Sequence, residues 1–196
     1  MTLRTASLVV PLLVAACLNS PASAADVLPV TDGTIYSTNT AITNQYIATS
    51  SSLRGALEFA ALDTSKFASF QLALNPYALP LGDLTVAIYG YGNADGAITG
   101  DDYNAGTLLG TLTLPVNLGY GQDAFFDATD FVRNVPGEFF GFNLRTDSGG
   151  DTFSSLEYNY GKPSRLVVTV VPEPSTCALL VMTGTGASLW WARRRR

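Results

Sequence analysis

Short runs in which apolar and polar residues alternate fill the middle of the chain, and glycine, proline, asparagine and aspartate separate them. Alternation with a period of two is typical of half-buried β-strands, and no long helical period interrupts it. The clearest runs are residues 53–59, 70–74, 84–88, 108–114, 140–144 and 166–170. With weaker runs at 34–36 and 155–158, we expect about eight to ten strands in an all-β, antiparallel β-sandwich or barrel.

One segment departs from this alternation. Phe125 and Phe126 lead into a stretch with Thr129 and Asp130 before its next apolar residues. Threonine and aspartate accept hydrogen bonds from the first free amides of a helix. The segment therefore predicts a strand end followed by one helical turn, with Thr129 or Asp130 as its N-cap.

The first 24 residues read as a signal peptide. Arg4 precedes an apolar run at 7–18, and the small residues Ala22 and Ala24 follow it. A signal peptidase recognises small residues at these two positions, so we expect cleavage between Ala24 and Ala25. The apolar run is too short to span a bilayer stably. Cys17 follows Val14-Ala15-Ala16, as in a lipoprotein box, and whether Cys17 is lipidated stays open.

The last 26 residues have three parts. Pro172, Glu173 and Pro174 end the domain, because proline has no amide to continue a sheet. The 16 mostly apolar or small residues at 177–192 would extend about 24 Å as a helix. This length is marginal for a hydrocarbon core of roughly 30 Å, but adequate with interfacial tryptophans and snorkelling arginines. Four basic residues then hold the end of this expected transmembrane helix in the cytoplasm. They are Arg193, Arg194, Arg195 and Arg196.

This C-terminal arrangement, from Val171 to Arg196, resembles the PEP-CTERM sorting signal. The resemblance implies processing near Pro172-Glu173-Pro174 by exosortase, a membrane-embedded transpeptidase. It also implies a Gram-negative host that makes extracellular polysaccharide, and an inner-membrane-anchored precursor that becomes a surface or extracellular protein. The polar stretch at 183–186 departs from the family pattern and weakens the anchor. A plain tail anchor, with the tail retained, remains the alternative.

Composition narrows the chemistry of the central domain, residues 25–170. The chain has no histidine, which excludes Ser-His-Asp catalysis and histidine metal sites, and its two cysteines lie in the terminal segments. Residues 25–171 contain 6 basic and 15 acidic side chains, a net charge of −9. Such a surface repels nucleic acid and suits cations, neutral sugars or simple solubility.

The order of the strand patterns resembles the jelly-roll domains of the disaggregatase-related (DNRLRE) type. The landmarks are residues 54–59, 126–132 and 140–145. The resemblance implies a jelly-roll-like β-sandwich of the kind found in bacterial surface proteins. A shared fold does not transfer a function, so the ligand stays open.

Residues 91–102 are the best candidate for a cation site. Asn93, Asp95 and Asp102 fall on ligand positions of a calcium loop, and Gly96 falls on its turn position. Tyr91 stands where an aspartate is expected, so a long polar hairpin loop is the competing interpretation. A second acidic loop at 147–151 is more simply explained as a turn than as a cation site.

Tyrosines and carboxylates offer two further kinds of site. Tyrosine stacks well on sugar rings but also lines sheet edges, and the candidates are Tyr89, Tyr91, Tyr103, Tyr120, Tyr158 and Tyr160. A glycosidase needs two carboxylates at a fixed separation, and nothing in the sequence brings Glu58 and Asp127 together. We expect a non-catalytic surface or matrix protein associated with polysaccharide. A calcium-stabilised carbohydrate-binding module and a glycoside hydrolase remain the alternatives.

Overall fold

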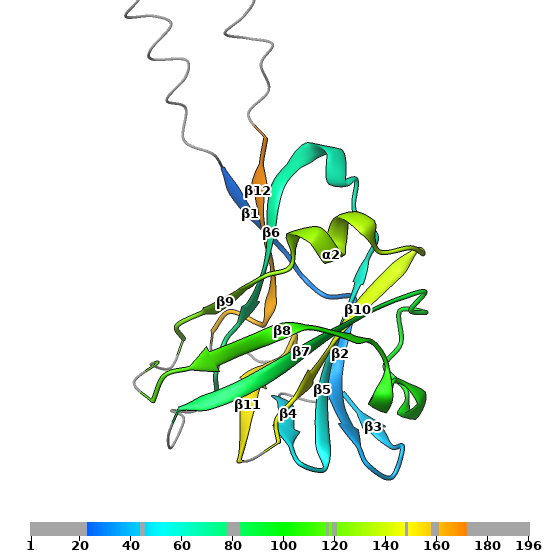
Figure 1. Ribbon diagram of the computed structural model, residues 1–196, viewed down its shortest axis with the longest axis vertical. Coiled ribbons are helices and arrows are strands. Elements are labelled where there is room, and N and C mark those ends of the chain that lie inside the picture. The colour runs from blue at the N-terminus through cyan, green and yellow to red at the C-terminus, as the bar shows by residue number, and fades with distance from the viewer. Residues whose placement is uncertain are drawn as a thin grey trace, which may run out of the picture. The chain divides into compact units, whose positions relative to one another are not determined.

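The alternating segments form strands that pair into antiparallel sheets, as a computed structural model shows (Figure 1). The structure describes residues 23–43, 46–77, 83–116, 118, 121–147, 149–157 and 161–171. Residues 1–22 of the signal segment and 172–196 of the sorting segment lie outside the described residues. Among the residues that the structure describes, no helix is long and apolar enough to cross a membrane.

The larger sheet has six strands in the order β3-β2-β5-β10-β7-β8. Their bounds are Thr31–Tyr36 (β2), Ala41–Ile42 (β3), Leu53–Ala60 (β5), Leu84–Gly92 (β7), Thr107–Leu114 (β8) and Phe139–Arg145 (β10). Each long strand points apolar residues to one face at every second position, as with Leu57 and Phe59 on β5. This alternation is what fixes the register of the central strands.

A smaller sheet has four strands in the order β1-β12-β6-β9. Their bounds are Ala24–Val27 (β1), Phe67–Leu74 (β6), Ala124–Asp127 (β9) and Arg165–Val170 (β12). A separate two-stranded sheet joins β4 (Tyr46–Ser50) to β11 (Gly150–Ser154). The remaining elements are two 3-10 turns, η1 (Thr64–Lys66) and η2 (Gly100–Asn104), and one short helix, α2 (Thr129–Asn134).

One hydrophobic core joins the two larger sheets, which makes the architecture β-sandwich-like. Phe59, Phe140 and Phe142 of the six-stranded sheet are fully or almost fully buried with Phe70 and Leu166 of the smaller one. Full burial of one such side chain contributes about 1.5–3 kcal/mol. The prediction of an all-β antiparallel fold is therefore confirmed.

Helix α2 adds Phe131 to this core. Its ring centroid lies 5.3 Å from that of Phe142 and 6.1 Å from that of Phe140. The approach needs glycine on the neighbouring strand, because a Cβ on Gly90 would lie 2.6 Å from the Phe131 ring. The expected helical turn is confirmed, but its N-cap is Ala128 and not Thr129 or Asp130. The aspartate that accepts a hydrogen bond from the start of the helix is Asp127, whose Oδ1 accepts from the Thr129 amide at 3.0 Å.

Two local predictions near residue 150 are wrong. Ser155–Glu157 lie in a turn, and the strand is Gly150–Ser154, part of which was expected to be a loop. Asp151 is accordingly buried and not part of an open turn. The strand forms because Phe153 enters the core and the backbone pairs with β4, about a hundred residues earlier. Such distant pairing leaves no local pattern.

Residues Ala24–Thr169 form one compact unit. The register pairs Ala24 with Thr169, so the first and last residues of the unit lie side by side in the smaller sheet. Figure 1 shows these ends at the top, far from the green η2 turn near the bottom right.

Candidate functional site

The outer face of the six-stranded sheet, which points away from the shared core, carries two buried polar residues, Glu58 and Asn143. Residues 93–106, hereafter the flap loop, fold across this face and include η2. Ile98 of the flap loop is buried against Ile35 of β2 and Ala56 of β5, and Tyr103 packs beside them. The loop is therefore a packed cover and not an open hairpin.

Strand β10 holds the flap loop by hydrogen bonds. The buried Asn143 donates through Nδ2 to the carbonyl oxygens of Asp102 at 2.6 Å and Tyr103 at 3.3 Å. Arg145, two residues further on the same face, donates through Nη2 to the carbonyl oxygen of Ala105 at 2.8 Å. These bonds tie the backbone of the flap loop to β10, and the Asp102 carbonyl also accepts from the Ala105 amide at 3.0 Å.

Beneath the flap loop, a buried carboxylate meets a buried phenol. Gly141 of β10 stands opposite both Glu58 of β5 and Tyr91 of β7 in the register. A Cβ on Gly141 would overlap the Tyr91 ring and hydroxyl. Because glycine has no side chain, the Tyr91 side chain can cross β10 at this position. The Tyr91 hydroxyl donates to Glu58 Oε1 at 2.9 Å, and both residues are buried.

Burial sets the ionisation of this pair. It raises the pKa of Glu58 to about 7; the Tyr91 hydrogen bond opposes the rise, and the charges of Asp102 and Asp95 add to it. The other carboxylate oxygen, Oε2, has no hydrogen-bond partner among the described residues. Burial and the Glu58 charge likewise raise the pKa of Tyr91 far above its usual value. Glu58 is thus readily protonated near neutral pH.

The proposed calcium ligands lie on the flap loop, and the two aspartate side chains among them have local partners. Asp95 Oδ1 accepts from the Ala97 amide at 2.9 Å, and Asp102 Oδ2 accepts from the Thr99 amide at 2.8 Å and its hydroxyl at 3.1 Å. Asn93 adopts a left-handed conformation with φ of 54°. The described residues contain no group of three or more histidines, cysteines, aspartates and glutamates that could hold a metal ion. The calcium site stays a prediction.

The two carboxylates considered for catalysis lie on different sheets. Glu58 lies on β5, buried under the flap loop, whereas Asp127 ends β9 of the smaller sheet and is exposed. Hydrogen bonds from the Thr129 hydroxyl and amide lower the pKa of Asp127. The structure therefore gives these two residues separate structural roles.

The tyrosines divide into three groups. Tyr91 is only 9% exposed, so its face cannot stack on a sugar from solution. Tyr89 and Tyr103 lie at the outer face, each under an arginine: Arg145 Cζ lies 3.7 Å from the Tyr89 ring centroid, and Arg54 Cζ lies 5.1 Å from that of Tyr103. Tyr120, Tyr158 and Tyr160 lie outside the described residues.

The sequence did not predict this arginine pair as a site. The available signal was two basic residues at the ends of apolar strand patterns in a strongly acidic domain. A second cluster was also missed: Arg165 binds Asp123 through both carboxylate oxygens, at 3.0 and 2.6 Å, and lies 3.0 Å from Asp26. Burial opposes the ionisation of Asp123, but hydrogen bonds from Arg165 and Asn75 outweigh it and lower the pKa of that carboxyl. This network links β1, β12 and the residue before β9, and so ties these parts of the smaller sheet together.

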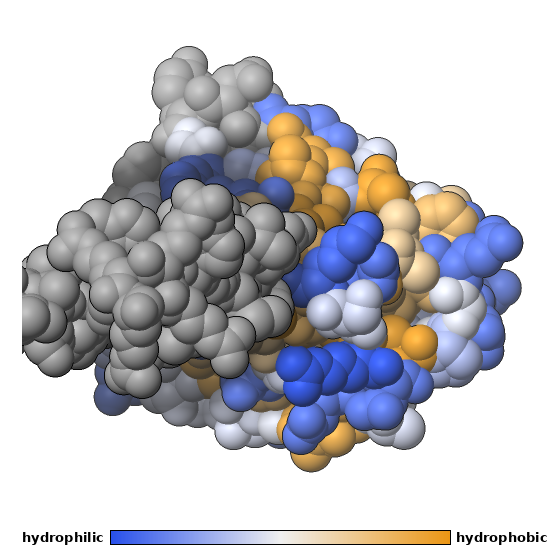
Figure 2. Space-filling model, turned by 90° about the horizontal axis from the view of Figure 1, so that it is seen from above, coloured by the Kyte–Doolittle hydropathy of each residue, from blue (hydrophilic) through white to orange (hydrophobic). Residues whose placement is uncertain are grey.

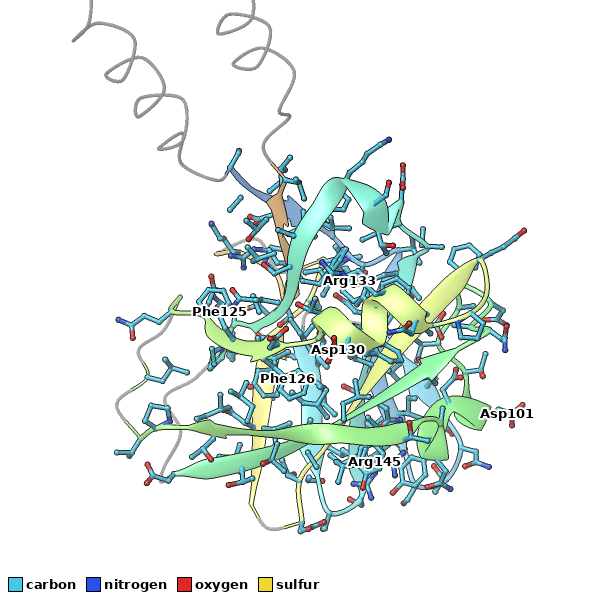
Figure 3. The ribbon with its side chains drawn as sticks, turned by 45° about the horizontal axis from the view of Figure 1, so that its top comes forward. Asp101, Phe125, Phe126, Asp130, Arg133 and Arg145 are labelled. Atoms are coloured by element: carbon cyan, nitrogen blue, oxygen red, sulfur yellow. The ribbon has the colours of Figure 1, made fainter. Side chains whose placement is uncertain are left out.

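An open groove of about 500 Å³ borders α2. Gly90, Gly92 and Gly106 form part of its wall, and Phe131 and Pro136 line the helix side. A Cβ on Gly92 would lie 2.7 Å from the Pro136 carbonyl oxygen, so this glycine is needed for packing. Figure 3 shows Asp130 of α2 beside Phe126, and Arg133 of the same helix away from Arg145.

The residues of the processing signals are mostly beyond what the structure describes. Ala24 and Ala25 lie exposed in β1, while Ala22 lies outside the described residues. So do the sorting residues Pro172, Glu173 and Pro174 and the four terminal arginines 193–196.

Neither a scan of protein-family models nor a search of curated proteins finds a match to this chain.

Proposed function

We propose that this chain is an exported, non-catalytic protein of the cell surface or extracellular matrix, whose jelly-roll-like sandwich contacts extracellular polysaccharide. A signal peptidase removes the N-terminal segment. The C-terminal segment stops in the lipid as a transmembrane helix until exosortase acts at Pro172-Glu173-Pro174. The support is the coincidence of these terminal signals, at 1–24 and 171–196, with an all-β unit between them.

One observation carries the proposal: Ala25, the expected first residue of the mature chain, pairs with Val168 near the end of β12. Both connections to the terminal segments therefore leave from the same end of the smaller sheet. The flap loop and η2 lie toward the opposite end of the unit (Figure 1). A protein held through its C-terminus would keep the flap loop free to meet molecules outside the cell.

The surface chemistry supports sugar contact better than contact with nucleic acid or lipid. The face in Figure 2 mixes apolar patches with polar residues. Exposed apolar side chains on β8 and β9 include Leu108, 56% exposed, and Phe125, 48% exposed. Sugars offer C–H faces and hydroxyls together, which suits such a mixture. The net charge of −9 between residues 25 and 171 disfavours polyphosphates and anionic membranes.

A polysaccharide panel tests this function. The purified chain, kept in a nonionic detergent that carries no sugar, is titrated calorimetrically with soluble polysaccharides while reducing ends are measured in parallel. The proposal expects binding to at least one polysaccharide without release of reducing ends. Release of reducing ends would show a hydrolase, and no binding across the panel would contradict sugar contact.

A further inference from the structure

The lysine and arginine side chains between residues 25 and 171 differ in whether they form ion pairs. Fifteen carboxylates and six basic side chains lie between residues 25 and 171. Lys66, Lys162 and Arg165 each form an ion pair. Arg54 and Arg145 form none with any described residue, although acidic groups outnumber basic ones more than twofold.

These two arginines are neighbours on one face. In the antiparallel pairing of β5 with β10, Leu144 stands opposite Gly55, so the next pair outward is Arg145 opposite Arg54. Each side chain also contacts the flap loop, Arg54 through the Tyr103 ring and Arg145 through the Ala105 carbonyl. The result is a pair of like charges at the edge of the flap loop.

Hydrogen bonds hold each guanidinium in place but leave one of its terminal nitrogens without an acceptor among the described residues. Arg54 donates through Nη1 to the carbonyl oxygens of Ser50 and Leu53, and Arg145 donates through Nε to Asn143 Oδ1 and through Nη2 to Ala105. No carbonyl or carboxylate of a described residue accepts a hydrogen bond from Arg54 Nη2 or Arg145 Nη1. The cation–π contact with a tyrosine holds each guanidinium, and these N–H groups are left for a ligand.

The charges of the pair are uncompensated. Burial lowers the pKa of Arg145, and the nearby Arg54 charge adds to the lowering while Tyr89 opposes it. An anion bound between the guanidiniums would remove this repulsion and accept their free N–H groups. A planar carboxylate matches the arginine fork best, because it can accept two parallel hydrogen bonds.

We propose that Arg54 and Arg145 bind the carboxylate of an acidic sugar, a uronic acid, within a polysaccharide in which neutral sugars separate the acidic ones. This inference rests on the proposed function and names its ligand. The acidic surroundings repel a densely charged polyanion, whereas one carboxylate flanked by neutral sugars meets only the local positive site. The partly exposed Leu108, which pairs with Tyr89 in the register, supplies an apolar surface beside it.

The test compares two polymers on the full chain in the same sugar-free detergent. Hyaluronan alternates a uronic acid with a neutral sugar, and dextran is neutral. The wild type should bind hyaluronan about tenfold or more tightly than dextran, a difference of about 1.4 kcal/mol. Arg54→Gln and Arg145→Gln should each remove that advantage. Arg133→Gln is the matched control, since Arg133 also lacks an ion pair among the described residues but bonds the carbonyls of Phe67 and Ala68 on another face. It should leave binding unchanged within about twofold.

If either glutamine variant has a lowered melting temperature, competition binding to the wild type tests the proposal instead. Methyl glucuronide should displace hyaluronan, and methyl glucoside and inorganic sulfate should not. Equal displacement by sulfate would overturn the assignment to a carboxylate. Folded Arg54 and Arg145 variants with wild-type hyaluronan binding would overturn the site while leaving sugar binding intact. Failure of the wild type to bind any polysaccharide would instead remove the proposed function, and this inference with it.

Discussion

Gly141 is the residue on which the buried contact between Tyr91 and Glu58 depends. Because Gly141 has no side chain, Tyr91 can cross β10 and donate to Glu58. A methyl group there must displace a tyrosine ring that is only 9% exposed. Overpacking of this kind costs about 1–3 kcal/mol, and loss of the hydrogen bond leaves a buried carboxylate without a partner.

We therefore expect Gly141→Ala to lower the free energy of unfolding by about 2 kcal/mol or more. Urea denaturation followed by circular dichroism measures this. A double-mutant cycle with Tyr91→Leu supplies the control, because without the ring the added methyl should cost much less. Additive effects of the two substitutions would show that the glycine is not required by Tyr91.

Glu58 should make stability depend on pH. Its pKa rises from 4.5 to about 7 on folding, so the folded state favours the protonated form. The resulting stabilisation is fully present below pH 4.5 and is lost as the pH rises through 7. A shift of this size corresponds to about 3 kcal/mol. Burial also raises the pKa of Asp32 to about 7, so the wild type combines two such effects.

Glu58→Gln should isolate one of these effects. The amide of the variant keeps an oxygen for the Tyr91 hydroxyl and cannot ionise, so the variant should gain about 3 kcal/mol relative to the wild type between pH 4 and pH 9. Unfolding curves at several pH values give the difference. Parallel pH profiles of the two proteins would show that Glu58 is not neutral in the folded state.

At the scale of elements, the alternating pattern predicted most of the sheet strands but not their partners. The six clearest runs are all strands, because each places apolar residues such as Leu57 and Leu72 in one core. Strands β4 and β11 were missed, since Thr49 and Asp151 are polar yet buried, and their pairing spans about a hundred residues. The local pattern reports burial of one face and carries no information on distant polar contacts.

The flap loop likewise shows that a local sequence pattern does not reveal distant contacts. Its polar composition predicted a loop, and its ligand-like spacing suggested calcium. Its anchors, Asn143 and Arg145, lie on β10, about 40 residues further along the chain. No spacing rule connects them to the loop, so the arginine pair could be found only once β5, β7 and β10 were in register.

Asn143→Ala should release the flap loop. The substitution removes the donor to Asp102 and Tyr103, which we expect to cost about 1–3 kcal/mol. Hydrogen exchange should quicken at the amides of Asp102 and Ala105, which bond within the loop. Asn134→Ala is the matched control, because that amide is exposed and bonds only Asp130 of its own helix among the described residues. Unchanged exchange in Asn143→Ala would mean that apolar packing alone holds the loop.

At the scale of the whole molecule, the proposed function combines export and C-terminal sorting with polysaccharide binding by the central domain. The two ends of Ala24–Thr169 lie together, which suits a unit held from one side. The sorting segment should be needed only for processing and not for folding of the sandwich, because the buried residues of the main core lie within 47–168.

Replacing Pro172, Glu173 and Pro174 with alanine should leave the unprocessed protein in the membrane fraction. The apolar segment and four arginines would still stop in the lipid, but exosortase would lack its motif. Cell fractionation with immunoblotting measures the shift. A control with alanine at Asp63, Ser65 and Lys66, exposed residues of the η1 region, should be processed normally. Equal processing of both variants would contradict the role of the motif.

The most direct test of the account is the mass of the mature protein recovered from its own cells. The proposed export and sorting predict a mature chain that begins at Ala25 and ends near Pro172-Glu173-Pro174, without the apolar segment and without Arg196. A surface protein whose mass includes residues 1–24, or one that still ends at Arg196, would contradict it.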